Sequence, residues 1–324
     1  MLKQFALGVL IFGLCGAALA QPAPLKVCLS EDNAPLSFAS KDPTATQGIQ
    51  GLDVRVAQAI AAELKRDLKL IPFETKYEQE TSLAHEVNAM LSSGVCDMAG
   101  GYLLLKSEVG APTRPTARVP DHPGAPRPPL RKWIPLGSLS GSQAYHSAAL
   151  GVVVREPGKP VGSLTDLSGM KVGAVVGTVE GTVLTIYRNG FLKRDIVSVS
   201  RGKEVLDMLQ AGSLDATLVP IDRFDAWRAK NPKHQLRRES YVHPVRFNIG
   251  FVALTRNATG ATGATGTTDA TDAPDVLAAA NKVINAARLN GDLQRWTESA
   301  GSTWTAPSEP NVGASIGLAD LLRE

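Results

Sequence analysis

Short apolar runs alternate with segments of helical periodicity in the first half of the chain. In residues 52–64, the apolar side chains of Val56, Ile60 and Leu64 recur at helical spacing after Gly51, which predicts a helix that begins near Asp53. A second helix is predicted over 83–92, before the glycine at position 94. The apolar runs between and around these helices predict strands at 25–29, 69–73 and 98–105. Such alternation predicts an α/β fold with a mainly parallel sheet.

The second half of the chain shows the same alternation. The stretch 164–178 is interpreted as a turn, a strand and a Gly-Thr corner, and a helix follows it. Further strands are predicted at 147–155, 196–199, 216–219 and 246–254, and further helices at 203–211 and 275–289. The segment 291–296 is expected to pack back on the first half.

Two segments, one in each half, nearly repeat each other. Residues 83–99 and 204–219 each contain a helix, a glycine, and an apolar run opened by an aspartate, Asp97 or Asp215. One such unit is common in any α/β domain, but the repetition indicates two α/β halves of similar construction.

Six motifs in a fixed order resemble those of bacterial extracellular solute-binding proteins of family 3. They are Gly51-Leu-Asp53, Gly94-Val-Cys-Asp97, the stretch from Leu164 to Gly169, Gly177-Thr178, Gly212-Ser-Leu-Asp215 and Asn290-Gly-Asp-Leu293. The resemblance covers roughly residues 24–300. It implies the type II periplasmic-binding-protein fold: two lobes, each a mainly parallel sheet flanked by helices, with a ligand between them.

The resemblance also implies a division of the chain into segments. A first part of lobe I covers 21–148, lobe II covers 149–246, and the chain returns to lobe I over 247–306. A C-terminal tail is expected at 307–324.

The first twenty residues have the pattern of an export signal. Lys3 is the only charge there, an apolar run follows from Phe5 to Leu14, and Ala18-Leu19-Ala20 fits a cleavage site. We therefore expect a periplasmic protein that is cleaved after Ala20. No later stretch approaches the roughly 20 apolar residues of a membrane-spanning helix.

Removal of this signal leaves two cysteines, Cys28 and Cys96. An even pair in an oxidising compartment favours a disulfide over a metal site, and two free buried thiols are the alternative. In the family, the strands that carry them are neighbours in lobe I.

Composition excludes several classes of function. The formal charge is +3, and +2 without Lys3, which is too little for a nucleic-acid-binding protein. The sequence contains no phosphate-binding glycine loop and no spacing of histidines that is typical of a metal site. We expect a monomer that is not an enzyme and has no cofactor.

Two segments depart from the family's pattern. Residues 110–135 contain eight prolines and five basic residues against one acid, Asp121. This composition predicts an extended surface insertion, either a simple solvated one or an arm that docks a partner. Residues 258–273 contain only Ala, Thr, Gly and Asp, which predicts a low-complexity loop.

The family's ligand site is only partly present. Receptors of this family clamp a carboxylate with an arginine and an ammonium with an acid, but the corresponding positions here are Val109 and Pro220. A standard amino acid is therefore not the expected ligand. Arg131 could replace the arginine if the segment before it is an insertion. The candidate ligand-binding residues are Ser30, Asn33, Gly101, Tyr102, Arg131, Gly177, Thr178 and Asp222.

Three functions remain open at this point. The first is a receptor that delivers a small polar or anionic ligand to an ABC permease. The second is a receptor-like accessory protein that docks on a periplasmic quinoprotein (PQQ) alcohol dehydrogenase, since such proteins carry similar Val-Cys and Cys-Asp dipeptides. The third is a periplasmic dehydratase, although its candidate acids and bases, Glu180, Asp222 and His243, are isolated in the sequence.

Overall fold

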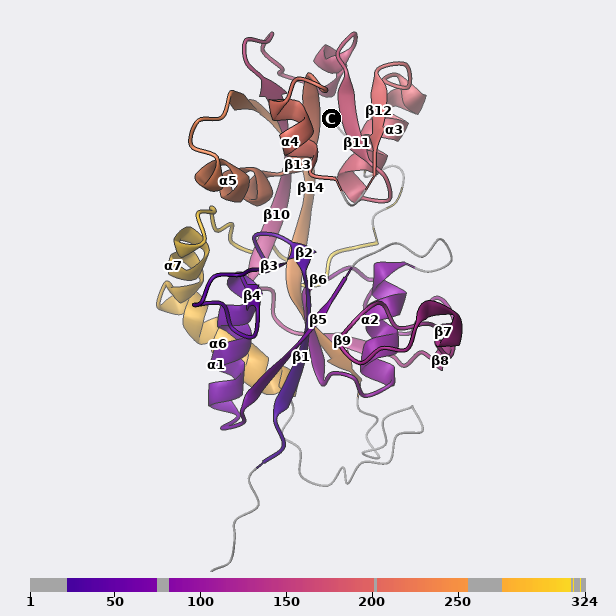
Figure 1. The fold of residues 1–324 in the computed structure, drawn as a ribbon, viewed down its shortest axis with the longest axis vertical. Coiled ribbons are helices and arrows are strands. Elements are labelled where there is room, and N and C mark those ends of the chain that lie inside the picture. Colours follow the sequence, from indigo (N-terminus) through magenta and orange to yellow (C-terminus); the bar gives the residue numbers. More distant parts are fainter. Residues whose placement is uncertain are drawn as a thin grey trace, which may run out of the picture.

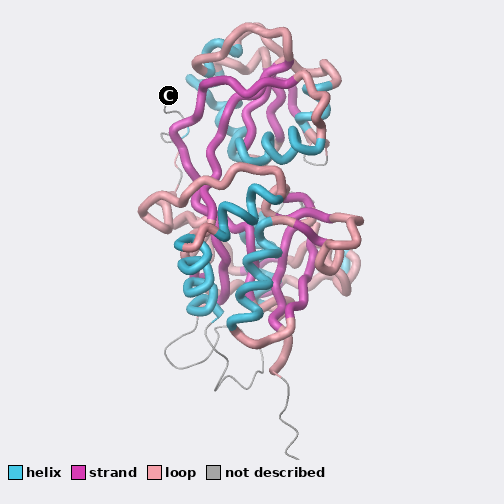
Figure 2. The backbone as a smooth tube through the Cα atoms, turned by 90° about the vertical axis from the view of Figure 1, so that its left-hand side faces the viewer, coloured by secondary structure: helices cyan, strands magenta, loops and turns pink. Residues whose placement is uncertain are grey.

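Two lobes, joined by a pair of long strands, make up the molecule (Figure 1). The computed structural model describes residues 22–74, 82–200, 203–255, 276–315, 317 and 321. The expected export signal, the low-complexity loop and part of the expected tail lie outside these residues. The joining strands are β10 (His146–Arg155) and β14 (Leu236–Leu254), which pair antiparallel. Figure 2 shows both strands running from one lobe into the other.

One sheet runs through both lobes. In the described part of the chain it has nine strands, in the order β12-β11-β13-β10-β14-β6-β1-β5, with β9 also paired to β14. We call the part with β1, β5 and β6 lobe I, and the part with β11, β12 and β13 lobe II. The three strands of each lobe pair in parallel, whereas β10 and β14 pair antiparallel to their neighbours.

Lobe I places helices on both faces of its strands. On β1, Leu25, Val27 and Leu29 face one hydrophobic cluster and Cys28 faces another, so the strand is buried on both sides, as is typical of parallel sheets. The first cluster includes α1 and α6, and the second includes α2. The helices and longer strands of lobe I are β1 (Leu25–Ser30), α1 (Leu52–Glu63), β5 (Leu68–Phe73), α2 (Leu83–Ser92), β6 (Met98–Leu103), β9 (Leu139–Gly141), α6 (Val276–Leu289) and α7 (Asp292–Ser299). Three short strands, β2 (Asp32–Asn33), β3 (Ser37–Ala39) and β4 (Ile49–Gln50), form a separate sheet.

Lobe II has the same layered construction. Its strands pack against α3 in one cluster and against α4 and α5 in another. Its elements are a 3-10 turn (Leu164–Leu167), β11 (Val172–Val175), α3 (Val179–Gly190), β12 (Ile196–Val199), α4 (Val205–Gln210), β13 (Ala216–Pro220) and α5 (Ile221–Lys230). The predicted α/β fold, with two lobes of mainly parallel strands and flanking helices, is confirmed.

Individual elements match the predictions closely, with two differences. The helix at 83–92 and the strand at 196–199 have the predicted bounds. The return strand β14 begins at Leu236, ten residues before the predicted start, because its first part pairs with β10 inside lobe II. Helix α5 was not predicted at all.

A disulfide joins Cys28 to Cys96, as predicted. Cys28 lies in β1 and Cys96 lies shortly before β6, and these two strands pair in parallel. Both cysteines are buried in the cluster that α2 covers. The bond therefore ties two central strands of lobe I together.

The proline-rich insertion at 110–135 is folded against lobe I. It contains two paired strands, β7 (Thr116–Ala117) and β8 (Ile134–Pro135), and a 3-10 turn (Pro128–Leu130). Figure 1 shows it beside α2. The short β7–β8 ladder differs from the fully extended segment that the prolines predict, and it is possible because the ladder is only two residues long.

Candidate functional site

The loops that follow the parallel strands bring polar side chains to the junction of the lobes. In open α/β sheets such carboxyl ends are where ligands bind. In lobe I these residues are Ser30, at the end of β1, and Asp32; in lobe II they are Thr178, after β11, and Asp222 and Arg223, after β13. The Ser30 hydroxyl donates a hydrogen bond of 2.6 Å to the Asp32 carboxylate.

Arg223 brings a cation to this junction. Its guanidinium lies 2.9 Å from the carboxylate of Glu204. Burial lowers the pKa of Arg223, but the carboxylates of Glu204, Glu180 and Asp32 together raise it. Glu204 and Glu180 belong to lobe II and Asp32 belongs to lobe I, so this guanidinium lies in the field of carboxylates from both lobes. We call these four residues the inter-lobe cluster.

A second contact joins the lobes beside this cluster. The Lys230 ammonium lies 4.0 Å from the centroid of the Phe38 ring, which is a cation–π contact between α5 and β3. Arg223 and Lys230 are seven residues apart, so they share one face of α5. That face of the helix meets lobe I.

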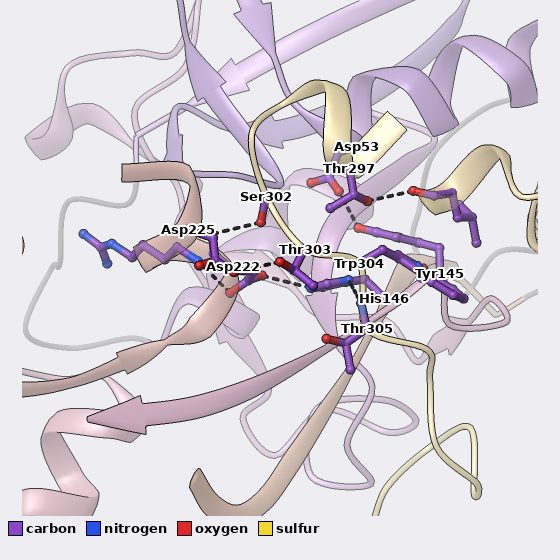
Figure 3. A network of polar contacts seen from close by, with 12 residues as sticks. Asp53, Tyr145, His146, Asp222, Asp225, Thr297, Ser302, Thr303, Trp304 and Thr305 are labelled. Atoms are coloured by element: carbon purple, nitrogen blue, oxygen red, sulfur yellow. Dashed lines mark hydrogen bonds and ion pairs between the residues drawn. The ribbon is translucent and has the colours of Figure 1, made fainter. Parts of the chain in front are cut away.

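A buried hydrogen-bond network lies where β10 begins (Figure 3). The Gly101 N–H donates to the Tyr145 hydroxyl over 2.9 Å, and that hydroxyl donates to the Asp53 carboxylate over 2.5 Å. Burial raises the pKa of Asp53 to about 6, and the Tyr145 hydroxyl opposes this shift. This network therefore holds a carboxyl group that titrates near neutral pH.

The first residue of β10, His146, links the crossing strands to α5. His146 Nε2 lies 2.9 Å from the Asp222 carboxylate, and its Nδ1 accepts a hydrogen bond of 3.5 Å from the Thr305 N–H. Because Nδ1 is an acceptor, the ring proton is on Nε2 and is donated to Asp222. The other Asp222 oxygen accepts from the Arg223 N–H over 2.8 Å. The carboxylate of Asp222 is thus occupied by partners within the protein.

Residues 302–313, which we call the hinge strap, run along both crossing strands. The Ser302 hydroxyl donates to the Asp222 carbonyl, and the Trp304 indole donates to the Tyr145 carbonyl (Figure 3). Farther along, the Asn248 amide of β14 donates to three strap carbonyls, and Gly313 pairs with the residues that follow β6. The strap therefore bonds to lobe II, to both crossing strands and to lobe I.

Three of the predicted ligand residues lie together in lobe I. A Cβ at Gly101 would lie 2.8 Å from the Asn33 amide nitrogen and 2.9 Å from an Asp53 oxygen, and Gly101 has a φ of +68°. Only glycine fits there, since both the space and the backbone conformation exclude a side chain. Ser30 lies close to this group, because its hydroxyl donates to Asp32, the residue before Asn33. Ser30, Asn33 and Gly101 therefore remain candidates for the ligand site.

Tyr102 points away from this group. It is buried in the cluster around α2, its hydroxyl donates to the Glu108 carbonyl over 3.2 Å, and burial raises its pKa above the usual range. The small cavity that it lines, about 10 Å³, has room for about one water molecule. Tyr102 belongs to the core of lobe I.

Arg131 is part of the insertion rather than of the junction. Its side chain is buried, forms an ion pair with Asp121, and donates to the carbonyls of Val119 and Pro126. These contacts hold the insertion together. The expectation that Arg131 replaces the family's cleft arginine is therefore corrected, because its guanidinium is used within its own segment.

In lobe II, Gly177 and Thr178 form the corner that precedes α3. Gly177 has a φ of +72°, and Thr178 is the N-cap of the helix. The Thr178 hydroxyl accepts from the Gly181 N–H over 3.1 Å and donates to the Val175 carbonyl over 3.0 Å. The hydroxyl is thus engaged in capping, which is a typical role of threonine at this position.

Asp32, Glu204 and Arg223 were not predicted as site residues from the sequence. Arg223 directly follows the predicted residue Asp222 and comes soon after a predicted strand. Its position in the sequence could therefore have indicated a site residue. Glu204 could not have been found in this way, since it acts as the N-cap residue of α4 and meets Arg223 only through the fold. Glu180 and Asp222, isolated in the sequence, both lie near Arg223 in space.

Neither a candidate metal centre nor a membrane-spanning helix is present among the described residues. No group of three or more histidine, cysteine, aspartate or glutamate side chains there could hold a metal ion. None of the helices in that part of the chain is long and apolar enough to cross a membrane.

The chain resembles proteins of known structure, although no family model and no curated protein matches its sequence. An amino-acid ABC transporter substrate-binding protein of Streptococcus pneumoniae bound to L-arginine shares 21% identity over 86% of this chain and 94% of its own, with a TM-score of 0.56. A histidine kinase sensor domain with similarity to periplasmic binding proteins shares 15% identity over 87% and 98%, with a TM-score of 0.56.

A third structure is the unliganded, open L-cystine solute receptor of Neisseria gonorrhoeae. It shares 16% identity over 88% of this chain and 96% of its own, with a TM-score of 0.52. At such identities the likeness concerns the fold. The chain therefore has the two-lobed fold that these receptors and this sensor domain share.

Proposed function

We propose that this chain is a periplasmic solute-binding protein that captures a small polar or anionic ligand between its lobes and delivers it to an ABC importer. The observation that carries the proposal is the inter-lobe cluster, in which Arg223 of lobe II faces carboxylates of both lobes. A ligand that binds such groups is held from both sides. Closure of the lobes about β10 and β14 would then enclose it.

The chemistry of the cluster suits a ligand with a carboxylate and a hydroxyl or amino group. A guanidinium binds a carboxylate through two parallel hydrogen bonds, and Arg223 can exchange Glu204 for such a ligand because its side chain is 27% exposed. On the lobe I side, Asp32 acts on the Arg223 guanidinium, and the Ser30 hydroxyl donates to Asp32. Since Val109 and Pro220 occupy the family's usual arginine and acid positions, we expect a ligand other than the standard amino acids.

The proposed role requires export of the protein to the periplasm. The charge and apolar pattern of residues 1–20 suits a signal that is cleaved after Ala20. The disulfide is stable in that oxidising compartment. The partner would be an ABC permease, and the protein would act as a monomer.

A second function is favoured by the same cluster. Arg223 and Glu204 pair with each other, and the Thr178 hydroxyl is used in capping, so these polar groups have partners without a ligand. This arrangement suits a receptor-like protein that docks on a quinoprotein dehydrogenase and binds no small molecule.

Calorimetric titration tests the first proposal. We would titrate the mature protein with small hydroxy acids, dicarboxylates and the standard amino acids, and repeat any positive titration with Arg223→Gln. Loss of the guanidinium should weaken binding at least tenfold, which corresponds to about 1.4 kcal/mol. Arg295→Gln is the matched control, because Arg295 is an exposed arginine on α7.

The outcomes separate the two functions. Binding that is weakened by Arg223→Gln and unchanged by Arg295→Gln supports the receptor. Binding that is equally strong in both variants contradicts the proposed site. If no compound binds and a quinoprotein dehydrogenase co-purifies with the protein from its host, the accessory role replaces the receptor role.

A further inference from the structure

Lobe II contains a cavity outside the inter-lobe cluster. Its volume is about 410 Å³, which is within the range of small-molecule sites. The side chains of Phe224 and Leu236, 1% and 4% exposed, line it as apolar groups. The cavity shares no lining residue with the cluster. It is therefore a second candidate binding site in the same lobe.

The geometry of α5 separates the two sites. Arg223 and Lys230 lie on the helix face that meets lobe I. Phe224, Asp225 and Arg228 lie on the opposite face, and all three line the cavity. Thr303 of the hinge strap closes another side, where its hydroxyl donates to the Asp225 carboxylate over 2.8 Å.

Arg238 enters the cavity from β14 on the same face of the strand as Leu236, since side chains alternate along a strand. Its stem lies over Gly151 of the neighbouring strand, where a Cβ would be 3.8 Å from the Arg238 Cδ and 3.0 Å from the Ile221 side chain. The Arg238 stem therefore packs beside Gly151, and the Ile221 side chain is the tighter neighbour of that glycine.

The charges that line the cavity are not balanced. Arg228 pairs with Asp225 at 3.3 Å, and Arg237 pairs with Glu156 at 3.3 Å. Among the residues that the structure describes, Arg238 has no ion-pair partner. One guanidinium in a concave, partly apolar site is therefore available to an anion.

We propose that this cavity binds a small organic anion that carries carboxylate or phosphate groups. Arg238 would form the main ion pair, with two parallel hydrogen bonds to one oxyanion. The Arg228 guanidinium, 5.9 Å from the centroid of the Phe224 ring, borders the apolar lining on which the carbon skeleton would rest. Glu156 opposes the anion, because it brings a negative charge to the lining of the cavity.

Titration calorimetry with citrate and, separately, with inorganic phosphate tests this site at low ionic strength. We expect sub-millimolar binding of at least one of the two anions, and the stronger one identifies the preferred oxyanion. Arg238→Gln should weaken that binding at least tenfold. Glu156→Gln should strengthen it, because the variant removes a negative charge from the rim.

Arg223→Gln distinguishes this site from the inter-lobe cluster. It should leave unchanged the part of the anion binding that Arg238→Gln removes, since Arg223 does not line the cavity. Binding that is lost in Arg223→Gln and retained in Arg238→Gln would overturn the cavity site and favour the cluster. The absence of heat with both anions, or equal affinity of Arg238→Gln and the unchanged protein, would also overturn it.

Discussion

The same turn occurs in both lobes, and a comparison of the two shows how one backbone arrangement is stabilised in different ways. In lobe I, the Asp97 carboxylate accepts from the Lys26 N–H over 3.0 Å, and the Asp97 N–H donates to the Lys26 carbonyl. In lobe II, Asp215 makes the same two bonds with Lys171, at 2.8 and 2.9 Å. Each aspartate thus joins the starts of two neighbouring parallel strands.

The residues that flank this turn differ between the two lobes. The residue before the aspartate is Cys96 in lobe I and Leu214 in lobe II, and the residue two positions after the lysine is Cys28 or Gly173. The cysteines form the disulfide. In lobe II, a Cβ at Gly173 would lie 2.6 Å from the Leu214 side chain, so the leucine fills the space beside the glycine. A covalent bond in one lobe therefore corresponds to apolar packing in the other.

A second pair of equivalent positions differs in charge environment. Asp53 and Glu180 are each the second residue of the first helix of their lobe, and both are buried. Glu180 acts on the guanidinium of Arg223. Asp53 instead accepts from the neutral hydroxyl of Tyr145. Burial thus raises the pKa of Asp53, although the Tyr145 and Ser37 hydroxyls and the nearby His146 oppose the rise.

The largest expected effect comes from removal of the disulfide. The bond closes a loop with a sequence separation of 68 residues, for which the chain-entropy model gives about 4 kcal/mol of stabilisation. We expect Cys28→Ser combined with Cys96→Ser to lower the urea midpoint of lobe I, measured by fluorescence or circular dichroism. The reduced, unchanged protein is the control and should behave as the variant does. Equal midpoints for oxidised protein and variant would contradict the expectation.

The second prediction concerns the pH dependence of stability through Asp53. The carboxyl has a pKa of about 6 in the folded protein and 3.8 as its ordinary value, so the folded state binds its proton more tightly. Stability should therefore fall as the pH rises from about 4 to above 6, by about 3 kcal/mol for this shift. Asp53→Asn should remove this fall and make the protein more stable at pH 7.5.

Urea unfolding at pH 4.5 and pH 7.5 measures this difference. Glu309→Gln is the control, because Glu309 is an exposed carboxyl and its removal should leave the pH dependence unchanged. If Asp53→Asn and the unchanged protein lose the same stability between the two pH values, the buried carboxyl is not the source.

The smallest effect is expected from Gly173→Ala in lobe II. The new Cβ would lie 2.6 Å from Leu214 Cδ1 and 3.0 Å from Val205 Cγ2, which overpacks a buried site and typically costs about 1–3 kcal/mol. Thermal unfolding should show a lower melting temperature. Gly162→Ala is the matched control in the same lobe, since its Cβ would meet only an Asp166 oxygen at 3.8 Å. A tolerated Gly173→Ala would show that Leu214 repacks freely.

The sequence predicted elements whose signals are local. The helix at 83–92 has a regular apolar pattern and ends before a glycine, and the structure has the same bounds. Helix α5 has a weaker apolar pattern because Asp222 and Asp225 are buried in it. Their partners include His146 and Thr303, which are far away in the sequence. No local pattern indicates such burial, so the helix was missed.

The candidate site was predictable only in part for the same reason. Asn33 comes soon after the first predicted strand and Gly101 lies within the predicted strand at 98–105, and the structure places them side by side. Whether Arg131 can bind a ligand depends on whether its segment folds on itself. The composition of that segment does not predict such folding. The pairing of Arg223 with Glu204 joins two helices of lobe II, and a single sequence gives no signal for it.

The disulfide also bears on the order in which the two lobes can be completed. Lobe I is built from two separate stretches, since α6 and α7 follow the whole of lobe II in the chain. In a chain that emerges N-terminus first, Cys28 and Cys96 are both present before any strand of lobe II. A bond formed at that stage would hold β1 and β6 side by side while α6, one of the helices that cover them, is still to come. The cross-link would then act as a temporary scaffold during biogenesis as well as a support of the finished protein.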